Sequence, residues 1–225
     1  MVRHLQREIE RLKKRVLALC ADVEKNVAMA TRAVGEQDKE LAQKVIDSDL
    51  GVDGIEVEIE EECLKILALH QPVAIDLRVI IAILKINNDL ERIGDLAVNI
   101  AERAIYLATQ KPLADKFDFP TMTDKVTAML RKGVDALVSM DATAAYKVCE
   151  ADDEVDELNR HMYNLVDSLI SEGRKEGHTL MHLLSVSRHL ERIADHATNI
   201  AEDVIYMITG DIVRHHIEDY TGSVQ

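Results

Sequence analysis

Apolar residues recur along most of the chain at intervals of three and four positions, the spacing of helices that bury one face. Only 3 Pro and 9 Gly interrupt the 225 residues, which favours long helices over many short strands. Asp38 is of the type that begins a helix, and Gly35 and Gly210 are of the type that ends one. The sequence therefore predicts an all-α protein. Its six long helices are expected at residues 4–34, 39–69, 72–109, 124–139, 141–172 and 177–209.

The chain contains an internal repeat. Residues 89–106 read DLERIGDLAVNIAERAIY, and residues 189–206 read HLERIADHATNIAEDVIY, so the two registers match without a gap. A weaker echo aligns residues 49–53 with residues 152–156, each followed by an apolar helical pattern. A repeat of this length indicates two similar halves of three helices each.

Short connections between the helices of a half force neighbouring helices to be antiparallel, so each half is expected to be a three-helix bundle. Helices of thirty residues are about 45 Å long, which makes each bundle elongated. Pro112 and Pro120, with both Phe residues of the chain, fall between the halves and indicate a connector. We expect the first repeat over residues 1–111, the connector over 112–123, the second repeat over 124–210 and a polar C-terminal tail over 211–225.

Composition narrows the possible partners. The 41 Asp and Glu outnumber the 27 Lys and Arg, and the net charge of −14 argues against nucleic-acid binding, which depends on cationic groups. No apolar run is long enough to cross a bilayer, so direct membrane insertion is not expected. The basic N-terminus lacks the apolar core of a signal peptide, and three scattered Cys residues indicate no disulfide framework. These features predict a cytoplasmic protein.

Oxygen-bearing side chains follow one stripe in each copy of the strong repeat, at intervals of four, four and three residues. Two further acids, one turn apart, lie on the preceding helix of each half. If these helices lie side by side, the carboxylates of a half converge on one site. The candidate metal ligands are Asp49, Asp53, Glu91, Asp95, Asn99 and Glu102 in the first half, and Asp152, Asp156, Glu191, Asp195, Asn199 and Glu202 in the second.

Carboxylates one turn apart repel one another, and a bound cation removes that cost. Ligand sets made only of oxygen suit Mg²⁺, Mn²⁺, Ca²⁺ or iron. The alternative is a solvated acidic face, on which Arg92 and Arg192 form ordinary surface salt bridges. Recurrence of the same register in both halves favours the metal site.

Four histidines share one face of the last long helix, at spacings of four, seven and seven residues: His178, His182, His189 and His196. Two His residues one turn apart are able to chelate a metal. The first half has no matching histidines, which favours a helix interface or a dimer surface instead.

Catalytic motifs are missing from the sequence. It contains no Gly-rich phosphate loop, no G-x-S-x-G and no H-E-x-x-H. The Glu-x-x-His pairs of ferritin-type oxidases are missing too. The sequence therefore does not predict an enzyme.

The duplicated LERI[GA]D-x-A-x-NIAE segments, each preceded by a D-x-x-x-D helix, resemble the PhoU family of phosphate-uptake regulators over residues 3–210. The resemblance implies two three-helix bundles with pseudo-twofold symmetry, a homodimer, and multinuclear metal clusters bound through E/D-x-x-x-D motifs. It also implies negative control of phosphate uptake and of the phosphate-starvation response. The implied partners are the phosphate ABC transporter ATPase and its phosphate-sensing histidine kinase, and no catalytic activity is implied.

The family motif falls on the first four candidates of each half, and the Asn and second Glu of each stripe rank behind them. The expected ions are Fe, Mn, Mg or Zn. His196 follows Asp195, whereas Leu96 follows Asp95, so the two sites should differ if that histidine tunes them. A second hypothesis is a metal-free helical scaffold whose acidic stripes dock a basic protein partner.

Overall fold

The computed structural model of the chain describes residues 2–115 and 117–211, which form helices and no strand. The helices are α1 (Val2–Glu36), α2 (Lys39–His70), α3 (Ala74–Leu107), α4 (Phe119–Ser139), α5 (Ala142–Glu150), α6 (Asp152–Ser171) and α7 (Gly177–Thr209). Helices α5 and α6 form one long element interrupted at Ala151. With that element counted as one, the six long helices predicted from the sequence are confirmed.

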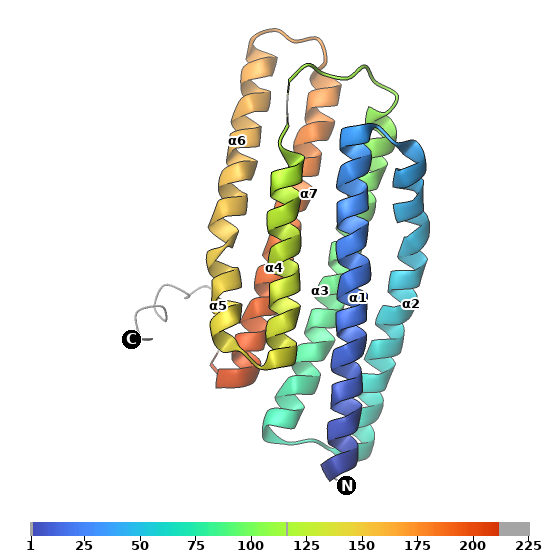
Figure 1. The fold of residues 1–225 in the computed structure, drawn as a ribbon, viewed down its shortest axis with the longest axis vertical. Coiled ribbons are helices and arrows are strands. Elements are labelled where there is room, and N and C mark those ends of the chain that lie inside the picture. The colour runs from blue at the N-terminus through green and yellow to red at the C-terminus, as the bar shows by residue number, and fades with distance from the viewer. Residues whose placement is uncertain (1, 116, 212–225) are drawn as a thin grey trace.

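Helices α1, α2 and α3 pack together as one three-helix bundle, and α4, α5 with α6, and α7 form the second (Figure 1). The bundles lie side by side, with α3 packed against α7 and α1 against α4. One continuous cluster of buried apolar side chains runs through both bundles. The two halves therefore share this main core, and a smaller cluster of Val166, Leu169 and Leu180 lies within the second bundle.

Side-chain capping fixes two of the predicted helix starts. Asp38 accepts a hydrogen bond from the Leu41 N–H at 3.0 Å, and Asp141 accepts one from the Ala144 N–H at 3.0 Å. Gly210 ends α7 with φ +85°, the left-handed conformation that glycine adopts readily. The caps at Asp38 and Gly210 were predicted from the sequence and are confirmed, whereas Asp141, predicted as the first residue of its helix, is the N-cap instead.

Other predicted helix boundaries differ from the structure. Helix α1 continues past Gly35 to Glu36, and the left-handed residue is Gln37, whose side chain donates a hydrogen bond to the Leu107 carbonyl at 3.0 Å. Helix α3 begins at Ala74, two residues after the predicted start. The predicted tail lies outside the described residues after position 211.

Helix α4 begins at Phe119, five residues earlier than predicted. Asp118 caps it by accepting the Thr121 N–H at 3.2 Å, and Pro120 occupies the first turn, where its missing N–H is not needed. Phe119 is buried in the shared core, so tertiary packing extends the helix into the proline-containing segment.

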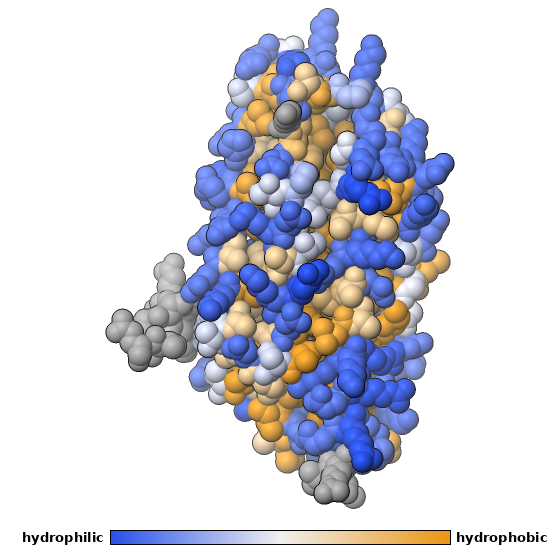
Figure 2. Space-filling model, viewed as in Figure 1, coloured by the Kyte–Doolittle hydropathy of each residue, from blue (hydrophilic) through white to orange (hydrophobic). Residues whose placement is uncertain are grey.

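The face in Figure 2 is largely hydrophilic, with apolar side chains visible in patches between charged ones. None of the helices in the described part of the chain combines the length and the apolar character needed to cross a membrane.

Candidate metal-binding faces

The first candidate site, here called the first acidic face, comprises Asp49 and Asp53 on α2 and Glu91 and Asp95 on α3. Burial raises the pKa of Asp49 above its ordinary value, and the charges of Asp53 and Asp95 raise it further. The pKa of Glu91 is raised by burial first, and then by Asp95 and Asp53. Carboxylates from the two helices thus lie close enough to disfavour each other's ionisation, as the sequence predicted.

Gly94 provides the close approach between the two helices. A Cβ atom at this position would lie 3.3 Å from Val52 Cγ1 and 3.5 Å from Asp49 Oδ1. The missing side chain therefore lets the Asp49 carboxylate lie against the α3 backbone, next to Asp95.

The second acidic face comprises Asp152 and Asp156 on α6 and Glu191 and Asp195 on α7. Burial raises the pKa of Asp152 to about 6, and Asp195, Asp156, Asp153 and Glu191 add to that increase. The pKa of Asp195 is likewise raised by burial and by Asp156, against a smaller opposing effect of nearby cations. The eight motif carboxylates form two groups of four, one on each bundle.

The second-rank candidate ligands are Asn99, Glu102, Asn199 and Glu202, and their surroundings differ from those of the motif carboxylates. Asn99 donates a hydrogen bond to the Asp95 carbonyl of its own helix at 2.9 Å, and Glu102 is exposed. Asn199 and Glu202 line a cleft with Lys85 of α3. A ligand role for these four residues stays a prediction.

Glu56 is a fifth carboxylate of the first acidic face that the sequence analysis did not name. Its pKa is raised by burial, by Glu60 and by Asp53, and its charge in turn raises the pKa of Glu91. Asn87 holds this side chain, because its Nδ2 donates to the Glu56 carbonyl at 2.9 Å and to Oε1 at 3.2 Å.

The corresponding pair on the second bundle is neutral: Ser187 donates a hydrogen bond to Asn159 Oδ1 at 2.8 Å. Asp153, an exposed neighbour that raises the pKa of Asp152, was also not named from the sequence. The two faces therefore share a motif and differ in the acids around it.

Arg92 lies within the first acidic face, with Nε 3.5 Å from Glu91 Oε2 and Nη1 3.4 Å from Asp95 Oδ2. Arg92 thus forms the surface salt bridges that the sequence analysis gave as the alternative to a metal site. On the second face, Arg192 lowers the pKa of Glu191 and Asp195 against the larger effect of burial. Arginine therefore partly offsets the negative charge of each face: Arg92 on the first, and Arg188 with Arg192 on the second.

The donor set of each face fits a hard cation, because all its ligands are oxygens and neighbouring carboxylates raise the pKa of several of them: Asp49, Glu91, Asp152, Glu191 and Asp195. Their ligand atoms are nevertheless spread out. Within residues 2–115 and 117–211, no three carboxylates of either face place one oxygen each within 4.8 Å of the others. Binding at either face would need side-chain rotations that bring the oxygens together.

The histidine face of α7 lies mainly at the interface between the bundles. His182 stacks on Tyr106 of α3 with ring centroids 3.8 Å apart, and His196 Nδ1 lies 2.8 Å from Asp89 Oδ1 of α3. Burial lowers the pKa of His189 to about 4, with further lowering by Arg103 and two other arginines. The interface interpretation is confirmed for His182 and His196, whereas His178 is exposed.

The fold and the two acidic faces define an all-helical tandem-repeat protein with paired carboxylate surfaces. The PhoU domain matches the chain twice, at residues 16–104 and 119–204, and the chain belongs to the PhoU family. The chain is 43% identical over 216 residues to the phosphate-specific transport system accessory protein PhoU homolog of Aquifex aeolicus, covering 96% of this chain and 98% of that one. A homolog with the same name in Clostridium acetobutylicum is 36% identical, covering 90% and 93%.

Solved structures agree with this assignment. The crystal structure of PhoU from Pseudomonas aeruginosa has a TM-score of 0.87 at 36% identity and covers 92% of this chain and 99% of that one. The phosphate transport system regulatory protein PhoU from Streptococcus pneumoniae has a TM-score of 0.87 at 27% identity, covering 93% and 99%. These names describe accessory and regulatory proteins rather than enzymes.

Proposed function

We propose that this protein regulates phosphate uptake as a metal-binding adaptor between the phosphate ABC transporter ATPase and the phosphate-sensing histidine kinase, with negative control of the phosphate-starvation response. It would act in the cytoplasm as a homodimer and without catalysis. The observation that carries the proposal is the convergence of carboxylates from two helices on each bundle of a chain that matches PhoU along both halves.

Asp49, Asp53, Glu91 and Asp95 would hold the ions of the first acidic face, and Asp152, Asp156, Glu191 and Asp195 those of the second. A bound Fe, Mn, Mg or Zn ion would neutralise these charges and connect the two helices that supply them. The carboxylates of each face come from two helices. An ion bound between them would change both the surface charge and the relative position of those helices. Metal occupancy would then change the surface that a partner meets.

Metal content tests the first part of the proposal. Protein purified without chelator or affinity-tag metal is incubated with Mn²⁺ and desalted, and bound Mn is measured by elemental analysis. The test variant carries Glu91→Gln, Asp95→Asn, Glu191→Gln and Asp195→Asn. The control carries the same kinds of change at exposed acids outside the faces: Glu61→Gln, Glu176→Gln, Asp124→Asn and Asp167→Asn.

We expect Mn in the wild type and the control, and little in the test variant. Equal Mn in all three proteins, or none in any of them after incubation with Mn²⁺ or ferrous iron, would contradict the metal sites.

The adaptor role needs a separate test with purified partners. The chain should bind the phosphate transporter ATPase and the kinase cytoplasmic domain, and it should bring the two into one complex. An ATPase from an unrelated ABC transporter serves as the control. Binding to neither partner, or equal binding to the unrelated ATPase, would overturn this role.

The alternative, a metal-free scaffold that docks a basic partner through its acidic faces, is favoured by one observation. Arg92 already pairs with both α3 carboxylates of the first face. Under this alternative, the quadruple test variant should slightly stabilise the free protein, because like-charge repulsion is removed, and should weaken partner binding in a salt-dependent way.

A further inference from the structure

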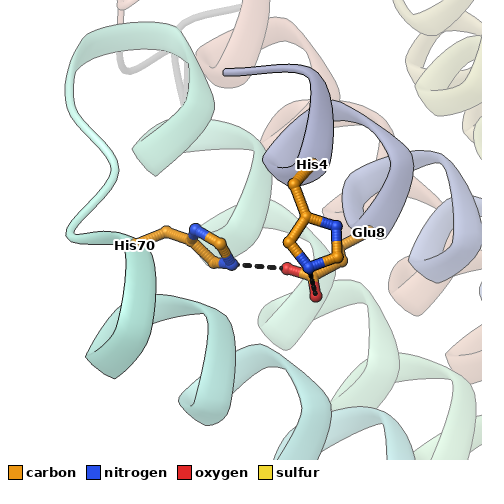
Figure 3. Close-up of side chains that lie close together, drawn as sticks. All are labelled: His4, Glu8 and His70. Carbon is orange, nitrogen blue, oxygen red and sulfur yellow. Dashed lines mark ion pairs between the residues drawn. The ribbon is translucent and has the colours of Figure 1, made fainter. Parts of the chain in front are cut away.

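Three possible metal ligands meet at the end of the first bundle (Figure 3). His4 and Glu8 lie one turn apart on α1, and His70 is the last residue of α2. One ligand atom from each lies within 4.8 Å of the others. Two helices that run antiparallel thus bring an α1 start and an α2 end to the same point.

The two imidazoles face the same carboxylate. His70 Nε2 lies 2.7 Å from Glu8 Oε2, and His4 Nε2 lies 3.5 Å from Glu8 Oε1. The rings stand edge to face with centroids 5.7 Å apart, so both Nε2 atoms point to one small volume. The chain turns away directly after His70, because Gln71 is left-handed at φ 45°.

Ordinary hydrogen bonding does not account for this arrangement. Glu8 Oε2 is buried, and no residue in the described part of the chain gives it a hydrogen bond of acceptable geometry, in spite of the short distance to His70. A buried carboxylate oxygen without a hydrogen bond is costly. An ion between the carboxylate and the two ring nitrogens would satisfy all three groups.

The donor set indicates the kind of ion. Two imidazole nitrogens and one carboxylate are ligands that Zn²⁺ accepts, with bonds of about 2.0–2.2 Å and tetrahedral geometry. Ligand atoms around such an ion are roughly 3.3 Å apart by that geometry. The contacts of 2.7 Å to Glu8 Oε2 and 3.5 Å to Glu8 Oε1 lie on either side of that value, and the three ligand atoms all lie within 4.8 Å of one another.

The position gives an ion both a firm hold and a route of entry. The side chain of His70 is only 12% exposed, whereas that of His4 is 69% exposed. Residue 70 lies 21 positions beyond residue 49 on the same helix, which is about 30 Å at 1.5 Å per residue. The cluster is therefore separate from the first acidic face.

We propose that His4, Glu8 and His70 form a Zn²⁺ site that fastens the start of α1 to the end of α2, with a water molecule as fourth ligand. The site differs in chemistry from the acidic faces, because it contains nitrogen ligands and they contain only oxygen.

Cobalt provides a direct test, since four-coordinate Co²⁺ with nitrogen ligands absorbs visible light far more strongly than six-coordinate Co²⁺ with oxygen ligands. The full chain, free of any tag and cleared of metal, is titrated with Co²⁺ and then with Zn²⁺ by calorimetry. His4→Gln and His70→Gln are the test variants, and His161→Gln and His178→Gln, at exposed histidines, are the controls. Far-UV circular dichroism checks that every variant is folded.

We expect strong Co²⁺ absorption in the wild type and both controls and its loss in both test variants. Zn²⁺ affinity should fall by more than the roughly 10–100-fold that loss of an outer ligand partner costs. The quadruple variant of the acidic faces should keep the Co²⁺ signal, so failure of the two proposals is distinguishable. Weak Co²⁺ absorption in the wild type, or unchanged Zn²⁺ affinity in His70→Gln, would overturn the site.

Discussion

Asp152 is the motif carboxylate whose protonation is most affected by its surroundings. Its pKa is raised to about 6, whereas an ordinary Asp and the unfolded chain have a value near 3.8. Between these values the folded state binds the proton more tightly than the unfolded state. The stabilisation from this proton is complete below the lower value and is lost as pH rises through the higher one.

We therefore predict that Asp152→Asn removes part of the pH dependence of the unfolding free energy. Relative to this variant, chelator-treated wild type should lose of order 1 kcal/mol of unfolding free energy between about pH 4 and about pH 7, after allowance for solvent screening. Urea unfolding at both pH values measures the difference, with Asp167→Asn on the exposed side of α6 as control. If the difference between wild type and Asp152→Asn is the same at both pH values, the proton is not bound as described.

Individual site residues were predicted by comparing the two copies of the repeat, so only residues that recur in both copies could be named. The eight motif acids recur in both halves and could be named. Glu56 could not, because the second half has Asn159 at the equivalent place and comparison of the halves discards such positions. His4 and His70 are far apart in the chain, and only the folded α1 and α2 bring them together.

At the scale of elements, Gly94 sets the distance between α2 and α3. Because the buried Val52 side chain has little room to move, Gly94→Ala should lower the unfolding free energy by about 1 kcal/mol, even though alanine favours helix formation. Gly54→Ala is the matched control on α2, since nothing lies within 4 Å of its added Cβ, and it should stabilise by up to about 1 kcal/mol.

Urea unfolding of the two alanine variants provides the comparison. Equal stabilisation by both substitutions would mean that α2 and α3 do not approach closely at Gly94. Mn²⁺ binding at the first acidic face should also weaken in Gly94→Ala, because Asp49 would be displaced.

Helix ends were predictable where the residue that caps the helix is adjacent to it in the sequence. Asp38 and Gly210 act within one turn, so their sequence neighbourhood contains the cause. The start of α4 depends on burial of Phe119 in the distant core, and the end of α1 depends on Gln37 bonding the α3 carbonyl. These contacts involve residues that are distant in the sequence, so the residues near a helix end do not predict them.

At the scale of the whole molecule, the contact between α3 and α7 joins the two bundles. Lys85 Nζ lies 2.7 Å from Oδ1 of the buried Asp203, and the lysine also lies 5.9 Å from the centre of the Tyr206 ring. Lys85→Met should lower the unfolding free energy by about 2 kcal/mol, because the buried Asp203 carboxylate loses the ammonium group that lies 2.7 Å from it.

The matched control is Lys125→Met, which removes an exposed pair with Glu154 and should change stability by at most about 1 kcal/mol. Addition of Asp203→Leu to Lys85→Met should restore part of the loss. Equal effects of the two lysine substitutions would show that the interface pair contributes no more than a surface pair.

The tandem arrangement followed from the repeat, but the way in which the halves pack did not. The pair His196 and Asp89 joins the bundles at positions where the two copies differ, since the equivalents are Leu96 and His189. When the two copies of the repeat are compared, such differences look like simple divergence and do not indicate a contact. Only the packing of α3 on α7 shows that they belong to one interface.

The continuous core has a consequence for the history of the chain. Duplicated segments are often modules that are exchanged or expressed alone, but here separation of the halves would expose apolar surface on α1, α3, α4 and α7. Each copy therefore depends on the other to bury part of its apolar surface. Recombination that preserves this protein must therefore transfer both copies together. The short segment between α3 and α4 connects two parts of one folding unit and is not a boundary between two independent domains.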